Sequence, residues 1–216
     1  MKTEFIESHI NRSNRNLLLI GMVLTITGGG LASLSWFPAL FAVPGLIALG
    51  SWLRRALNPS GHPIYKRLSQ YGDCHELAQQ VNREFSRVKS SDTTNFGANW
   101  LAQGETYGLS LVPWSDIAWL HTYIRTQGGI RTSCWVRVWS REGKQFLAPA
   151  GLRLGEVEQL LEDLRARAPW AEAGHSQELQ QEWNKRRTEF VARVEARRAR
   201  YRTEVATRSV SGYSQI

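Results

Sequence analysis

The hydrophobic pattern of the chain is dominated by one long apolar run near the N-terminus. Between Arg15 and Arg54 lie 38 residues without a charged side chain. A membrane-spanning helix needs about 20 apolar residues and at least about 17, so this run has the length of two short spans joined by a tight turn. Ser33 and Pro38 interrupt the run near its middle. We therefore predict a transmembrane helical hairpin. Its two helices span about residues 16–34 and 38–53.

Three other structures with a long apolar run have to be weighed against the hairpin. A signal peptide has an apolar core of about 7–15 residues, which is far shorter. A single helix of 38 residues would be about 57 Å long at 1.5 Å per residue, nearly twice the thickness of the hydrocarbon layer. It would also hold Pro38 and Pro44 in its interior, where proline breaks or kinks a helix. A hairpin buried in the core of a soluble domain is the third alternative.

Positive charge flanks the predicted hairpin on both sides. Arg12 and Arg15 precede the first helix, and no charged residue lies in the turn. Arg54 and Arg55 follow the second helix. Because short loops rich in arginine and lysine stay on the cytoplasmic side, we expect both chain ends in the cytoplasm. Residues 1–15 would then form a short cytoplasmic segment.

Small residues recur along the first predicted helix, largely one turn apart. Such residues allow a neighbouring helix backbone to approach closely. The neighbour is either the second helix of the same chain or a second copy of the protein, which would make it a homodimer. The small residues are Gly21, Thr25, Gly28, Gly29, Ala32 and Ser33.

After the hairpin, residues 58–168 have the pattern of a globular domain. Pro63 favours the first turn of a short helix, and Asp73 can cap a second one. From Asn95 to Ala150 the apolar residues alternate, as in β-strands. Three tight-turn signals divide this stretch into a meander, and a helix at about 154–168 follows. The turn signals are Gln103-Gly104, Gly128-Gly129 and Glu142-Gly143.

The register of the central hairpin predicts which residues share a face. If Gly128-Gly129 is a two-residue turn, Trp119 faces Val138 and His121 faces Val136. These residues would then form one apolar face. We expect the opposite face to meet solvent or a partner, because it carries two arginines. Its residues are Trp135, Arg137, Trp139 and Arg141.

Two segments of this domain carry a resemblance to a known group of proteins. The first is Asn-Pro-Ser-Gly-His-Pro-Ile-Tyr-Lys-Arg-Leu at 58–68, followed by Gly72-Asp73, and the second is Trp-Ser-Asp-Ile-Ala-Trp at 114–119. On these segments the chain resembles bacterial membrane proteins, most of them uncharacterised, in which a two-span hairpin precedes a small pleckstrin-homology-like domain. The resemblance implies a scaffolding or sensing domain on the cytoplasmic side of the bacterial inner membrane, and no catalytic residue.

The last segment, from Ser176 to about Val205, has the pattern of one long basic amphipathic helix, with a flexible tail at 206–216. Residues 185–208 hold nine basic and three acidic side chains. The helix could pack on the domain or on a second copy. It could also lie on the anionic inner leaflet, where each basic residue adds about 1 kcal/mol. Nucleic acid is the partner we expect least. The apolar stripe comprises Leu179, Trp183, Phe190, Val194, Tyr201 and Val205.

The sequence contains no recognisable catalytic or metal-binding motif. The five histidines are scattered without ligand spacing, and Cys74 and Cys134 lie 60 residues apart, so we expect no metal and no cofactor. Gly28-Gly29-Gly30 lacks the lysine and hydroxyl residue that follow in a phosphate loop. We therefore predict that the protein is not an enzyme.

Together these patterns predict an α+β membrane protein that acts as a non-catalytic interaction or scaffolding module. Its contacts would be the lipid bilayer, anionic lipid head groups or an unknown protein partner. The alternative is an accessory subunit of a membrane enzyme or transporter, whose site forms only with a partner. The candidate contact residues are Trp135, Arg137, Trp139, Arg141, Trp183, Phe190, Arg197, Arg198, Arg200 and Arg202.

Overall fold

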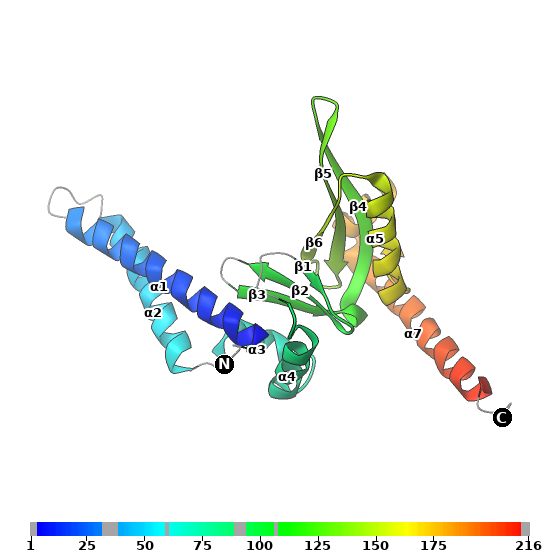
Figure 1. The fold of residues 1–216 in the computed structure, drawn as a ribbon, viewed down its shortest axis with the longest axis horizontal. Coiled ribbons are helices and arrows are strands. Elements are labelled where there is room, and N and C mark those ends of the chain that lie inside the picture. Colours follow the sequence, from blue (N-terminus) through cyan, green and yellow to red (C-terminus); the bar gives the residue numbers. More distant parts are fainter. Residues whose placement is uncertain (1–3, 32–38, 59–60, 89–93, 106–107, 213–216) are drawn as a thin grey trace. The chain divides into compact units, whose positions relative to one another are not determined.

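A computed structural model describes five stretches of the chain, which form two compact units, residues 1–111 and 112–216. Figure 1 shows the elements in chain order. The predicted α+β class is confirmed: a helical hairpin comes first, antiparallel sheets follow, and helices end the chain. The described stretches are residues 4–31, 39–58, 61–88, 94–105 and 108–212.

The first unit begins with a hairpin of two helices, α1 (Phe5–Leu31) and α2 (Ala39–Leu57). The helical hairpin was predicted, but α1 begins at Phe5 rather than at residue 16. Within the described stretches, no helix is both long and apolar enough to cross a membrane. The predicted turn between the helices lies outside the described residues.

Small residues let α1 and α2 pack closely against each other. A Cβ atom added to Gly45 would lie 2.5 Å from Oγ1 and 2.7 Å from the backbone nitrogen of Thr25. A Cβ atom on Gly21 would lie 2.8 Å from the side chain of Leu49. Such distances leave no room for a larger residue. Of the two neighbours expected for the small residues of the first helix, the structure shows the second helix of the same chain.

The early start of α1 places its first turn in the core of the first unit. The ring of Phe5 stacks on that of Phe85, with centroids 5.0 Å apart, and the backbone N–H of Ile6 donates to Oδ1 of Asn82 at 2.9 Å. Phe5 and Ile6, expected to lie in a short cytoplasmic segment, therefore contribute to a folded core. The other buried members are Ile64, Leu68, Ala78, Val81, Trp100, Ala102, Leu109 and Leu111.

The rest of this core comes from two short helices and a three-stranded sheet. The predicted cap is confirmed, because Oδ1 of Asp73 accepts from the N–H groups of His75 and Glu76, both at 2.9 Å. The turn predicted at Gln103-Gly104 is wrong, since a strand runs through it. The elements are α3 (Pro63–Leu68), α4 (Cys74–Glu84), β1 (Thr94–Phe96), β2 (Trp100–Glu105) and β3 (Gly108–Pro113).

The second unit is built on a four-stranded sheet in the order β6-β5-β4-β7. Three strands form an antiparallel meander, and the short β7 pairs in parallel with the start of β4. Helix α5 (Leu154–Arg167), at the position predicted for a helix, packs on one face of the meander. The strands are β4 (Ile117–Gln127), β5 (Ile130–Ser140), β6 (Gln145–Ala150) and β7 (Glu172–Ala173).

The predicted register of β4 and β5 is wrong by one residue over most of its length. Gly128 and Gly129 form the expected two-residue turn, with φ of 58° and 78°. A β-bulge at Arg125 and Thr126 then shifts the pairing. As a result, Trp119 faces Trp139, and not Val138. A shift of one residue moves a side chain to the other face, so Trp119 lies on the face that carries the arginines.

The C-terminal helix predicted as one continuous element consists of two, α6 (Gln177–Lys185) and α7 (Arg187–Gly212). Ser176 caps α6 as expected, because its Oγ accepts from the N–H of Leu179 at 3.1 Å. The break falls at Arg186, whose backbone leaves the helical conformation. Both helices pack on the second face of the sheet.

Candidate interaction surfaces

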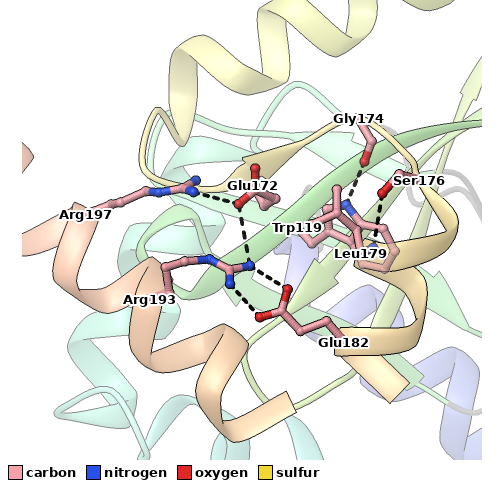
Figure 2. A network of polar contacts seen from close by, with 8 residues as sticks. All are labelled: Trp119, Glu172, Gly174, Ser176, Leu179, Glu182, Arg193 and Arg197. Carbon is pink, nitrogen blue, oxygen red and sulfur yellow. Dashed lines mark hydrogen bonds and ion pairs between the residues drawn. The ribbon is translucent and has the colours of Figure 1, made fainter. Parts of the chain in front are cut away.

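Aromatic rings gather where α6 and α7 cover the sheet. The centre is the fully buried Trp119, whose ring centroid lies 5.8 Å from that of Trp183 and 5.9 Å from that of Phe190. The indole N–H of Trp119 donates to the carbonyl oxygen of Gly174 at 2.8 Å (Figure 2). The N–H group of a buried indole usually finds an acceptor within the protein. The aromatic face is thus covered by the chain's own C-terminal helices.

His121 is held in one neutral form within this cluster. Its Nε2 accepts a hydrogen bond from Nε1 of Trp139 at 3.2 Å, and its Nδ1 lies 3.1 Å from the carbonyl oxygen of Thr122. The proton must therefore reside on Nδ1, which donates to that carbonyl. Burial, aided by the positive charges of His175 and Arg137, lowers the pKa of His121 to about 4, although the hydrogen bond to Thr122 acts in the opposite direction. The ring also stacks on that of His175, with centroids 4.9 Å apart.

Ion pairs fasten α7 to α6 and to β7 (Figure 2). Arg193 donates from Nη1 and Nη2 to the two carboxylate oxygens of Glu182, at 2.5 and 2.9 Å. Its Nη2 also lies 3.9 Å from Glu172, which in turn pairs with Arg197 at 2.8 Å. The hydrogen bond from Arg193 lowers the pKa of Glu182. Arg197, predicted to contact lipid or a partner, is therefore engaged within the domain.

A second group of charges joins α7 to the start of β4. Arg141 pairs with the buried carboxylate of Asp116 and, at 2.5 Å, with Glu195 of α7. Glu195 also lies 3.6 Å from Arg198, whose guanidinium sits 5.8 Å from the centroid of the Trp170 ring. Arg141 and Arg198 were both candidates for an external contact. In this fold, they hold the C-terminal helix against the sheet.

The remaining predicted residues fall into two groups. Trp183 of α6 and Phe190 of α7 are buried between these helices and the sheet, and Trp139 packs beside them, so the fold leaves none of the three as an open lipid-binding surface. The others are partly or fully exposed. Arg137 lies over the Tyr123 ring at 3.6 Å, Trp135 stacks on the same ring, and Arg200 and Arg202 lie on the far half of α7.

Residues 170–175 have a structural role that the sequence pattern did not predict. Glu172 binds two arginines of α7, and Gly174 accepts the hydrogen bond of Trp119. Both lie in or beside β7, which has only two residues. A strand of two residues is too short to show an alternating pattern, so no hydrophobic period could have revealed it.

The described stretches contain no group of three or more histidine, cysteine, aspartate or glutamate side chains placed to hold a metal ion. Cys74 and Cys134 are free thiols. No family model, no curated protein and no solved structure matches this chain. Its function is therefore argued from its own surfaces.

Proposed function

We propose that this chain is a membrane-anchored, non-catalytic interaction module, held in the bacterial inner membrane by the α1–α2 hairpin with both termini in the cytoplasm. One observation carries the proposal: the hairpin packs Gly21 and Gly45 between its helices and exposes large apolar side chains on its outer faces. A helical hairpin folded in water does the opposite, because burying large apolar side chains drives its packing. In a bilayer that drive is absent, since lipid tails solvate such side chains.

The exposed apolar side chains recur mostly three or four residues apart, so they form one strip along each helix. Ile26 of α1 is 72% exposed and Ile47 of α2 is 65% exposed, whereas Gly21 and Gly45 are buried between the helices. Soluble monomers seldom leave so continuous an apolar surface in water. The strips comprise Leu19, Met22, Val23 and Ile26 on α1, and Val43, Leu46, Ile47 and Leu53 on α2.

The charged end of the hairpin supports the proposed orientation. Nη1 of Arg55 donates to Oγ of Ser13 at 3.3 Å, so the start of α1 and the end of α2 lie side by side. The arginines that flank the two helices therefore belong to the same end of the hairpin. Under the positive-inside rule, that end stays in the cytoplasm.

The order of elements supports a pleckstrin-homology-like assignment for residues 58–168. Among the described residues, β1 to β6 precede α5 and form two antiparallel sheets, and α5 packs on the sheet that contains β4, β5 and β6. Domains of this architecture suit binding and scaffolding, because their sheets and loops present surfaces rather than a catalytic cleft. The fold alone does not determine a function, so the hairpin remains the main argument.

Reporters fused before Met1 and after Ile216 test the topology directly. We expect both to read as cytoplasmic, and a periplasmic reading at either end would contradict the proposal. A second test determines whether lipid or water surrounds the hairpin. Lysines at Val23 and Leu46 should shift the chain out of the membrane fraction if lipid surrounds them, because charge inside a bilayer is costly.

The matched control places lysines at Tyr201 and Val205, which are exposed apolar residues of α7. These changes add the same charge without touching the hairpin, so the chain should stay in the membrane fraction. If the Val23→Lys and Leu46→Lys variant fractionates like this control, the strips face water and the anchoring proposal fails.

A further inference from the structure

The β4–β5 hairpin extends beyond the rest of its sheet (Figure 1). On one side, β6 pairs only with Cys134–Trp139 of β5, and on the other β7 pairs only with Trp119 and Leu120 of β4. Within the described residues, only Arg125–Ser133 therefore form a two-stranded ribbon with no further strand on either edge. Its tip is the tight turn at Gly128 and Gly129, so the ribbon ends in a narrow, convex point.

Large apolar side chains are exposed on this hairpin. Ile130, directly after the turn, is 72% exposed, and Ile124 is 39% exposed. Ile130 lies in the two-stranded part, whereas Ile124 pairs with Cys134 at the position where β6 joins the sheet. Leu152 and Leu154, at the start of α5, are exposed as well. The hydrogen bond from Nη1 of Arg131 to the carbonyl oxygen of Leu152, at 3.0 Å, ties this second apolar group to the ribbon.

Basic residues predominate around these side chains. From Ile117 to Arg141 the chain contains no acidic residue, while Arg125, Arg131 and Arg137 lie within the hairpin. Arg153 adds a further exposed arginine at the start of α5. Glu156, the first acidic residue of α5, places its carboxylate against Gly151. Apolar side chains bordered by arginines are the pattern of proteins that insert into the interface of anionic membranes.

We infer that the tip of the β4–β5 hairpin, with the start of α5, is a contact site for an anionic lipid surface. Ile130 enters the interface and the arginines meet the head groups. A flat anionic surface fits a convex, cationic tip better than a folded partner does, since the tip offers no concave surface for an anchoring side chain. The inference rests on the proposed function, to which it adds a lipid partner. The contact of the tip with anionic lipid does not itself require the α1–α2 hairpin to be inserted in the membrane.

A polarity-sensitive fluorophore at the tip tests the inference in the full chain. Gln127→Cys, in a Cys74→Ser background, offers one exposed thiol for an NBD label, because Cys134 is buried. The labelled protein is reconstituted into phosphatidylcholine vesicles with or without phosphatidylglycerol. We expect brighter, blue-shifted emission only with phosphatidylglycerol, and its loss as salt rises, because salt screens the attraction.

Matched variants then identify the residues responsible. Arg125→Gln and Arg131→Gln should each weaken the contact about fivefold, as expected for one basic residue at a charged surface, and Ile130→Ser should weaken it too. The control, Arg200→Gln with Arg202→Gln, removes two charges from α7 and should leave the signal unchanged. Near-UV circular dichroism confirms that each variant is folded.

Two outcomes would overturn the inference: emission that ignores phosphatidylglycerol, or a signal that the α7 control abolishes and the tip variants do not. An acidic peptide that shifts the emission when anionic vesicles do not would assign the tip to a protein partner instead. Anchoring is read separately, from co-sedimentation with phosphatidylcholine vesicles. Failure of the hairpin proposal and failure of this one are thereby distinguished.

Discussion

Trp139 and His121 are joined by a hydrogen bond in which the indole Nε1–H donates to the imidazole Nε2, 3.2 Å away. The bond requires an imidazole without a proton on Nε2, and the other ring nitrogen already donates to the carbonyl of Thr122. Protonation of His121 therefore breaks the contact with Trp139 and places a charge in a buried aromatic cluster. The stability of the second unit should depend on pH for this reason.

We predict that the second unit loses stability as pH falls below about 6.5, the pKa of an unfolded histidine. The pKa of His121 is lowered to about 4 in the fold, so the unfolded chain binds the proton first. The stability contributed by neutral His121 is fully present above the pKa of histidine in the unfolded chain, and it falls progressively until pH reaches about 4. Urea unfolding followed by near-UV circular dichroism should show a loss of about 2 kcal/mol at pH 5.

His121→Gln removes the titrating group and should flatten this slope, whatever its effect on stability at pH 7. Some slope should remain, because burial lowers the pKa of His62 in the first unit to about 4 as well. An unchanged slope in the His121→Gln variant would show that other groups control the acid sensitivity.

Gly45 and Gly50 of α2 form a matched pair for testing the close approach of the hairpin helices. Gly45→Ala should force the helices apart, because its Cβ would meet the backbone nitrogen of Thr25 at 2.7 Å. We expect a destabilisation of about 1–3 kcal/mol, as for other overpacked sites. Gly50→Ala meets nothing within 4 Å and should be neutral or slightly stabilising, since alanine favours helix. Thermal unfolding in detergent measures both, and equal midpoints would contradict the packing described.

Arg193 and Arg200 lie on the same helix but differ in their contacts. Arg193→Gln removes both hydrogen bonds to Glu182 and the pairing with Glu172. Because the guanidinium is partly exposed, solvent screens these pairs, and we expect a loss of only about 1 kcal/mol. Arg200→Gln should change stability by less than about 0.5 kcal/mol. Urea unfolding at low and high salt checks the difference, which should shrink as salt rises.

Substitutions at Ile6 and Ile26 test the finding that the first turn of α1 lies in the core of the first unit while its later turns lie in the hairpin. Ile6 is fully buried in the core of the first unit, whereas Ile26 is exposed on the outer face of the hairpin. Ile6→Ala should cost about 2–5 kcal/mol, the usual range for a buried isoleucine. Ile26→Ala should have a much smaller effect. Similar losses from both substitutions would mean that the first turn of α1 is not part of the core.

The features that could be predicted from the sequence are those set by neighbouring residues. Asp73 and Ser176 cap their helices as expected, because a capping side chain bonds to backbone groups two or three residues away. The two-residue turn at Gly128 and Gly129 follows for the same reason, since glycine readily adopts positive φ.

The sheet faces could not be predicted, because they depend on single extra residues. Thr132 is the additional residue of the bulge, and its Oγ1 donates to the carbonyl of Arg125 at 3.2 Å. The turn at Glu142 and Gly143 likewise holds three residues, since Ser140 pairs with Lys144. No local signal distinguishes these cases from a regular hairpin, yet each reverses the faces beyond it.

The candidate surface on the sheet was misjudged for a different reason. The arginines of β5 indicated a face open to solvent or to a partner, but the partner is the chain's own C-terminus. Arg141 reaches Glu195, 54 residues later. A contact over that separation leaves no trace in the local pattern, and the stripe containing Trp183 and Phe190 was compatible with packing on the domain, with a second copy and with a lipid surface.

The unbroken course of α1 has a mechanical consequence. Its 27 residues make a helix about 40 Å long at 1.5 Å per residue. Its first turn contacts Phe85 and Asn82, and the helix also packs against α2. Such a helix acts as a lever, because a tilt of its apolar end has to displace Phe5 and Ile6 at the other. A close-packed core resists that displacement. The inclination of the hairpin is therefore transmitted as strain to the core beneath it.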